Sequence, residues 1–260
     1  MKRKFFFPGP EGVKLCGILT DPQPKNFGPV WILAHGSNTN KNSTNIVRLA
    51  EILEKKGVAT LRIDLYAHGE SGGKYEEMTL TIEARAVLAA VRFLKTRGYK
   101  RIGLLGSSYG GSAAIIAASK THSLFALALK SPVADYPDLF NLVLSSKEIA
   151  DWEKTGRLND PLRDDPKLWI KYAFFTDAVK NDGYKLARKI LIQTLIVHGD
   201  KDEDVPLEQS RRLVKSLKNG RLEVVAGADH RYTKLPHTKK MLALFADFMV
   251  REARMSLRMI

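Results

Sequence analysis

Two adjacent serines, Ser107 and Ser108, lie in the glycine-rich stretch GSSYGG. A nucleophilic serine at an abrupt strand-to-helix turn needs small residues two positions before and two positions after it, because larger side chains there would collide with the flanking elements. Ser108 has Gly106 and Gly110 at these positions, whereas Ser107 has a leucine and a tyrosine. The spacing predicts Ser108 as the nucleophile of an acyl transfer and Ser107 as a packing or hydrogen-bonding neighbour.

This chemistry also needs a base beside the serine and a third group that orients the base. His230 is the predicted base, because it follows the last predicted strand and comes late in the chain, as the order nucleophile, acid, base requires. The acid is predicted in the stretch HGDKDEDVP, which follows an apolar run. That stretch offers four carboxylates: Asp200, Asp202, Glu203 and Asp204. Only one of them can orient the imidazole, and the residues alone do not separate the four.

The elements that must position these residues alternate in the order expected of a mostly parallel α/β sheet. Short apolar runs predict strands at residues 4–7, 13–19, 30–34, 59–63, 102–105, 125–129, 195–197 and 222–225. Helical patterns fit residues 43–56, 81–97, 108–118, 207–217 and 238–255. The first two runs precede any helix and are joined by the turn PGPEG, so they should form an antiparallel hairpin at one edge of the sheet.

One segment interrupts this alternation, from about residue 131 to residue 189. It is rich in aromatic side chains, carries several prolines and glycines, and has helical periodicity without a convincing strand. An insertion of this kind predicts a small helical cap over one edge of the sheet; the alternative is an extra helical layer that contacts no ligand. Since 260 residues can share one core, we expect a single domain over residues 1–260.

The composition argues against several other classes of protein. Lys and Arg number 42 against 28 Asp and Glu, a net charge of +14, but the basic residues do not cluster. Without zinc-finger spacing or an RNA-recognition motif, we expect no nucleic-acid partner. The single cysteine, Cys16, rules out an intrachain disulfide. No apolar run is long enough for a membrane span or a signal peptide, so we expect a cytoplasmic protein.

Signature loops of the α/β-hydrolase superfamily resemble five stretches of this chain in the same order: HGSNTNK (35–41), DLYAHGESGG (64–73), GSSYGG (106–111), HGDKDEDVP (198–206) and GADH (227–230). The chain resembles most closely the small serine esterases, including the feruloyl and cinnamoyl esterase-like group. The resemblance implies an α/β-hydrolase fold, with a mostly parallel eight-stranded sheet and helices on both faces. It also implies Asp202 as the triad acid, and the backbone N–H groups of Ser37 and Tyr109 as the oxyanion hole.

The resemblance further implies a carboxylesterase that acts on a small-molecule ester through an acyl-enzyme intermediate. No cofactor and no metal are expected, and a homodimer is compatible with the sequence. Within the same fold, a peptidase or amidase related to prolyl oligopeptidase, or a thioesterase, stays open as an alternative. A catalytically silent binding protein is a further alternative, which the intact set of Ser108, Asp202 and His230 disfavours.

Overall fold

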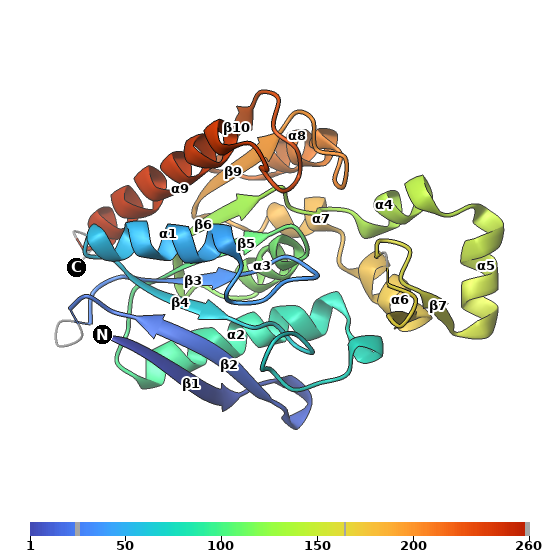
Figure 1. The fold of residues 1–260 in the computed structure, drawn as a ribbon, viewed down its shortest axis with the longest axis horizontal. Helices are drawn as coiled ribbons and strands as arrows, with labels where there is room; N and C mark the ends of the chain where they lie inside the picture. The colour runs from blue at the N-terminus through green and yellow to red at the C-terminus, as the bar shows by residue number, and fades with distance from the viewer. Residues whose placement is uncertain (24–26, 164, 258–260) are drawn as a thin grey trace.

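The computed structural model describes residues 1–23, 27–163 and 165–257, whose centre is an eight-stranded sheet (Figure 1). Its strand order is β1-β2-β4-β3-β5-β6-β9-β10. The strands are β1 (Lys2–Pro8), β2 (Lys14–Thr20), β3 (Val30–Ala34), β4 (Ala59–Ile63), β5 (Ile102–Ser107), β6 (Leu124–Lys130), β9 (Gln193–Gly199) and β10 (Gly220–Val225). β1 and β2 form an antiparallel hairpin at one edge, β2 is antiparallel to β4, and the other pairs are parallel. The predicted sheet is therefore confirmed, with each strand end within two residues of its expected position.

Helices cover both faces of the sheet, as predicted. One face carries α1 (Thr44–Lys55) and α9 (Leu235–Ser256); the other carries α2 (Leu80–Thr96), α3 (Tyr109–Ser119), α7 (Gly183–Ala187) and α8 (Leu207–Ser216). Two 3-10 turns are described, η1 (Pro10–Gly12) and η2 (Tyr75–Glu77). The last helix begins three residues before its predicted start, because its first turn accommodates Pro236. Among the described residues, no helix combines the length and the apolar character needed to cross a membrane.

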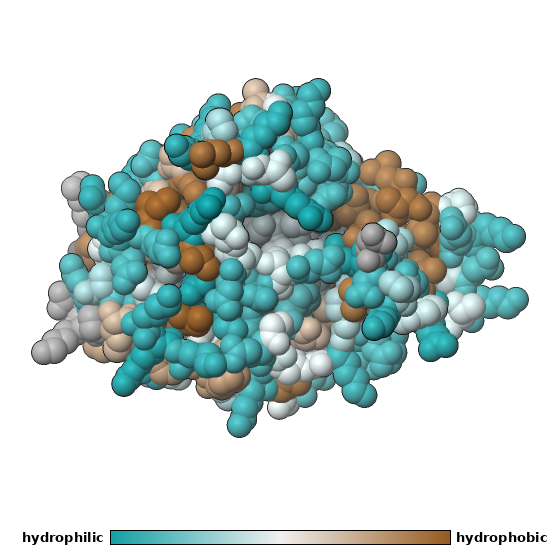
Figure 2. All heavy atoms as spheres, viewed as in Figure 1, coloured by the Kyte–Doolittle hydropathy of each residue, from teal (hydrophilic) through white to brown (hydrophobic). Residues whose placement is uncertain are grey.

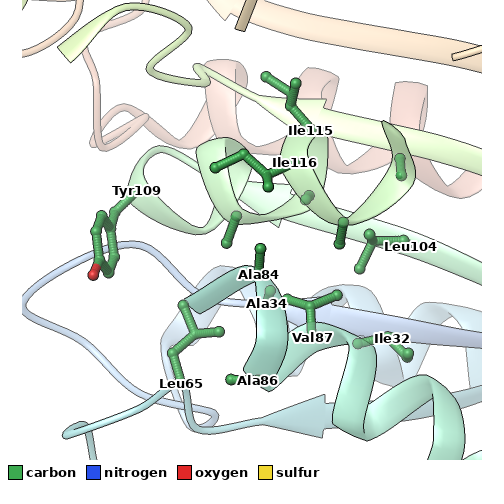
Figure 3. Close-up of a cluster of buried hydrophobic side chains, with 14 of the residues drawn as sticks. Ile32, Ala34, Leu65, Ala84, Ala86, Val87, Leu104, Tyr109, Ile115 and Ile116 are labelled. Carbon is green, nitrogen blue, oxygen red and sulfur yellow. The ribbon is translucent and has the colours of Figure 1, made fainter. Parts of the chain in front are cut away.

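The layer between the sheet and helices α2 and α3 fixes the start of α3. Figure 3 shows side chains of β3 and β5, such as Ile32 and Leu104, meeting Ala84 and Val87 of α2 and the small residues of α3. The small side chains let both helices approach the sheet and each other closely. Burying a large aliphatic side chain in such a layer contributes roughly 1.5–3 kcal/mol, so the position at which β5 passes into α3 is held by packing on both sides.

Residues 131–189, called the insert below, extend beyond the end of the sheet (Figure 1). Their elements before α7 are α4 (Tyr136–Val143), α5 (Ser146–Thr155), β7 (Arg157–Asn159), β8 (Trp169–Lys171) and α6 (Tyr172–Lys180). The antiparallel pair β7–β8 corrects the expectation of a segment without strands, because three residues are too few to show an alternating pattern in sequence. Where the two ends of the insert meet, Gly183 N donates to Ala134 O over 2.9 Å. Apolar side chains gather over α4, where Leu142 and Val143 are exposed (Figure 2).

A buried ion pair anchors the loop that follows β3. Lys41, whose side chain is 2% exposed, donates from Nζ to Asp64 Oδ2 over 2.5 Å and to Glu70 Oε1 over 2.8 Å. Its backbone N–H donates to Asp64 Oδ1 over 2.8 Å, and Arg62 Nη1 donates to its carbonyl over 2.7 Å. Lys4 reaches the same network from the surface, with Nζ 2.8 Å from Glu70 Oε2. The loop after β3 is therefore locked to β4 and the loop after β4.

We expect Lys41→Met to destabilise the fold by roughly 3–5 kcal/mol, because it leaves the Asp64 carboxylate buried without its cation. Lys4→Met is the matched control, since it removes an exposed lysine from the same network. Urea unfolding of the three proteins measures the difference. Equal midpoints for Lys41→Met and Lys4→Met would show that the buried pair does not hold this loop.

Candidate active site

Ser108 lies at the turn between β5 and α3, in a strained backbone conformation with φ 51° and ψ −115°. Its N–H donates to Lys130 O over 2.8 Å, and its own carbonyl accepts from Gly111 N over 2.8 Å. A Cβ on Gly106 would come within 2.3 Å of Gly110 O, and one on Gly110 within 2.2 Å of the carbonyl oxygen of residue 35. Both contacts are too short for any side chain, so the small residues demanded by the turn are sterically required here.

His230 and Asp202 lie together in the loops after β10 and β9. His230 Nδ1 is 2.8 Å from each carboxylate oxygen of Asp202. The Asp202 side chain is fully buried and also accepts from the backbone N–H of Val205 over 2.8 Å and of Asp204 over 3.1 Å. Burial alone would raise the pKa of Asp202, but the hydrogen bonds from His198 and His230 hold it well below its usual value. An ionised Asp202 fixes the proton of His230 on Nδ1, which leaves Nε2 to act as a base.

The other carboxylates of the β9 loop take different places. Asp200 Oδ1 accepts from Gly227 N over 2.5 Å and so links the two loops. Asp204 has a half-exposed side chain and places Oδ2 4.0 Å from His230 Nε2. Glu203 Oε2 accepts from the backbone N–H of His230 over 3.4 Å. Of the four candidates, Asp202 is the one bonded to Nδ1.

His198 is a second histidine bonded to Asp202, a role that was not predicted from the sequence. Its Nε2 is 3.1 Å from Asp202 Oδ2 and 3.0 Å from Val205 O, while Nδ1 is 2.7 Å from Ser210 Oγ. With the proton on Nε2, His198 donates toward Asp202 and Val205 and accepts from the Ser210 hydroxyl. The signal in the sequence was the histidine four residues before the aspartate in HGDKDEDVP.

Ser108 and His230 both follow the carboxyl ends of strands of the sheet, β5 and β10, but no hydrogen bond joins their side chains within the described part of the chain. Hydrogen bonds between a nucleophile and its base are commonly long before substrate binds and tighten in the complex. The Asp202–His230 pair is thus formed in this structure, whereas no hydrogen bond from Ser108 to His230 is found among the described residues.

The loop after β3 passes directly beside the turn that holds Ser108. A Cβ on Gly36 would lie 3.4 Å from Ser108 Cβ, so the two backbones are in contact. In the ranges that the structure describes, no acceptor takes a hydrogen bond from the N–H of Ser37 or of Tyr109. Free backbone donors on both sides of a serine are what an oxyanion hole requires.

His35 holds this loop and is itself neutral. Its Nδ1 lies 2.5 Å from Gly36 O, and its Nε2 accepts from Leu65 N over 3.1 Å. Burial lowers the pKa of His35 to about 3, so the imidazole stays uncharged at neutral pH. His35 therefore serves as a fixed link between the loops after β3 and β4.

One cavity lies between the sheet and the insert. Ser37 and Tyr109 line it from the sheet side, and the insert contributes aromatic side chains that include Tyr136, Phe140 and Phe174. The rings of Tyr136 and Phe174 pack edge to face with centroids 5.2 Å apart. Ser37, Tyr109 and an aromatic wall thus line one narrow cavity of about 20 Å³, which has room for about one water molecule.

The same cavity has a polar part, formed by Tyr75 of η2 and by two residues of the insert. Tyr75 OH donates to Asp160 Oδ2 over 2.6 Å, and Arg163 Nε lies 3.8 Å from that oxygen. Arg163 Nε is buried and has no hydrogen-bond partner among the described residues. The cavity therefore offers a hydrogen-bond donor as well as apolar contact.

Glu83 is a buried carboxyl that sequence reasoning missed, because it lies within the predicted helix 81–97 among apolar residues. Tyr109 OH is 3.0 Å from its Oε1, and Tyr66 N donates to its Oε2 over 3.0 Å. Burial raises the pKa of Glu83 to about 8, so the group is mostly protonated at neutral pH. Glu83 thereby ties the side chain of Tyr109 to the loop after β4.

One group of described residues has the atom types of a metal site, with ligand atoms of Cys16, Asp64 and Glu70 within 4.8 Å of one another. Lys41 Nζ bonds both carboxylates of this group. The ammonium of the chain itself therefore provides the cation there.

The fold, with a strained serine after β5 and a paired histidine and aspartate in later loops, defines the chain as an α/β hydrolase. Within this superfamily the chain belongs to the prolyl oligopeptidase family, which it matches over residues 44–256.

Relatives of known sequence or structure agree with this placement. The chain is 28% identical over 207 residues to Protein ABHD12B of Homo sapiens, covering 75% of this chain and 51% of that protein. It is 24% identical over 252 residues to the uncharacterized peptidase YuxL of Bacillus subtilis, covering 89% and 36%. It thus spans about half or less of the length of these two relatives. The structure of Est1E from Butyrivibrio proteoclasticus with ferulic acid bound is 29% identical, with a TM-score of 0.77 over 95% of this chain and 98% of that one.

We expect Asp202→Asn to lower kcat/KM by roughly ten-thousandfold, because the amide no longer fixes the proton of His230 on Nδ1. Asp204→Asn is the matched control in the same loop and should cause a much smaller loss. Steady-state hydrolysis of a nitrophenyl ester compares the two variants. A larger loss for Asp204→Asn would assign the acid to the carboxylate near Nε2 instead.

Glu83→Gln should gain stability relative to the wild type as the pH rises. The unfolded chain releases the Glu83 proton near pH 4.5, whereas the folded chain keeps it until about pH 8, so wild-type stability from this group is lost across that interval. Glutamine does not titrate. Urea unfolding near both ends of the interval tests this, and a pH-independent difference between the two proteins would mean that the buried carboxyl is ionised in the fold.

Proposed function

We propose that the protein is a serine hydrolase that cleaves carboxylic esters through an acyl-enzyme intermediate. The observation that carries this proposal is the pairing of His230 Nδ1 with a buried, ionised Asp202 at the sheet edge where the strained Ser108 lies. His230 Nε2 takes the proton of Ser108 as the hydroxyl attacks the ester carbonyl. The N–H groups of Ser37 and Tyr109 bind the oxyanion.

Collapse of the tetrahedral intermediate breaks the ester C–O bond, and His230 gives its proton to the leaving alcohol. Water then enters, His230 takes a proton from it, and the resulting attack on the acyl-enzyme releases the carboxylic acid and restores the Ser108 hydroxyl. Each proton taken by His230 is thus returned within the cycle. Apart from the ester and water, these steps use groups of the chain itself.

The aromatic residues that line the narrow cavity favour an aromatic or otherwise flat acyl group as the preferred substrate. Its wall is built of Tyr109, Tyr136 and Phe174, and it holds the donor of Arg163. The similar protein Est1E binds ferulic acid, an aromatic acid with oxygen substituents. We therefore propose esters of substituted aromatic acids as the first substrates to test.

A peptidase or amidase is the second candidate, and the family match favours it. The chain belongs to the prolyl oligopeptidase family and is similar to a protein named as a peptidase. The triad chemistry is the same for an amide, with an amine as the leaving group. Aminoacyl amides and thioesters therefore belong in the same substrate panel.

Ser108→Ala should lose roughly a millionfold in kcat, because no other hydroxyl replaces the nucleophile. Ser107→Ala, the adjacent serine, should keep a substantial part of the activity. A fluorophosphonate probe should label the wild type and Ser107→Ala but not Ser108→Ala. Folded wild type that neither binds the probe nor turns over any ester, thioester or amide of the panel would contradict the proposal.

A further inference from the structure

Lys130, the last residue of β6, contacts the backbones of both the nucleophile and the base. Its carbonyl accepts the N–H of Ser108 over 2.8 Å. Its ammonium donates a hydrogen bond to the carbonyl of His230, one hundred residues away in the chain. In the sheet it is paired with Ser107 of β5 and Val197 of β9. One residue therefore links the turn at Ser108, the β9 strand that leads to Asp202, and the loop that carries His230.

The ammonium of Lys130 is buried without a direct ion pair. The residue is 8% exposed, and its Nζ lies 5.1 Å from the centre of the Tyr232 ring. Among the described residues, no carboxylate comes within 4.0 Å of Nζ. Burial lowers the pKa of Lys130 to about 8, so it carries its charge at neutral pH. A charge kept in such a place is costly and calls for a compensating field.

That field comes from the loops that carry the triad. The groups around Lys130 and His230 are Asp202, Glu203 and Asp204 of the β9 loop, Asp229 and Tyr232 of the β10 loop, and His198 of β9. Two of the carboxylates lie within 4.0 Å of the His230 ring. The Lys130 ammonium is thus bonded to one of these two loops and lies in the field of the acids of both.

We propose that Lys130 is a positioning residue of the reaction, which holds the His230 backbone against the strand beside Ser108. This inference rests on the proposed function. It assigns Lys130 no contact with substrate. The residue acts through the position of His230.

Three variants separate the hydrogen bond from the charge. Lys130→Met removes both, Lys130→Gln keeps an N–H donor without the charge, and Lys130→Arg keeps both. The matched control is Lys95→Met, an exposed lysine at the end of α2 whose Nζ lies 2.5 Å from Ser123 Oγ. For each protein, kcat and KM for a nitrophenyl ester are measured across pH and referred to the folded fraction from circular dichroism.

We expect Lys130→Met to lower kcat by roughly 10- to 100-fold, a change in activation free energy of about 1.4 to 2.7 kcal/mol, with little change in KM. Lys130→Gln keeps a hydrogen-bond donor, so it should show a smaller loss of kcat, and it decides the question if Lys130→Met does not fold. Lys130→Arg and Lys95→Met should keep kcat close to that of the wild type.

A purely structural role would lower the thermal midpoint but leave kcat per folded enzyme unchanged, and that result would overturn the proposal for Lys130 alone. Wild type that neither reacts with a fluorophosphonate nor turns over any substrate of the panel would overturn the proposed function as well. The two failures are therefore distinguishable.

Discussion

The positive φ of Ser108 is the constraint to which the rest of the site is fitted. A non-glycine residue holds this conformation only where its surroundings over-determine it. Here the surroundings are the contact of Gly110 with the loop after β3, the packing of α3 on the sheet, and the hydrogen bond from Ser108 N to Lys130 O. The same contacts bring the Gly36 backbone against Ser108. Strain at Ser108 and proximity of the predicted oxyanion donors thus have one structural cause.

Buried charge is used in two ways around this turn. Lys41 is neutralised at short range by Asp64 and holds a loop in place. Lys130 has no carboxylate at such a distance among the described residues and lies instead in the combined field of several acids. Although the chain has a net charge of +14, several of its acids lie in the two loops around His230. His35 and Glu83 add polar links without charge at neutral pH.

Local patterns in the sequence predicted the features that are fixed by steric contacts between residues close together in the chain. Glycine spacing selected Ser108 over Ser107, and apolar runs located the strands, because both depend on residues adjacent in the chain. The choice of Asp202 among four acids came from family resemblance, since loop geometry that orients a carboxylate leaves no periodic signal. Lys130 and Glu83 were not found, because their roles depend on contacts with residues far away in sequence. The strands β7 and β8 were not predicted, because three residues are too few to show an alternating pattern.

The two ends of the insert meet where it joins the sheet. Gly183 and Ala134 are joined by a hydrogen bond, so the chain leaves the sheet after β6 and returns before β9 through a closed junction. The segment beyond that junction supplies cavity residues such as Tyr136 and Phe174, while Ser108 and Asp202 lie outside it. Under the proposed function, substitutions in the insert would therefore change which substrates the cavity accepts, while Ser108 and Asp202 keep their positions in the loops of the sheet.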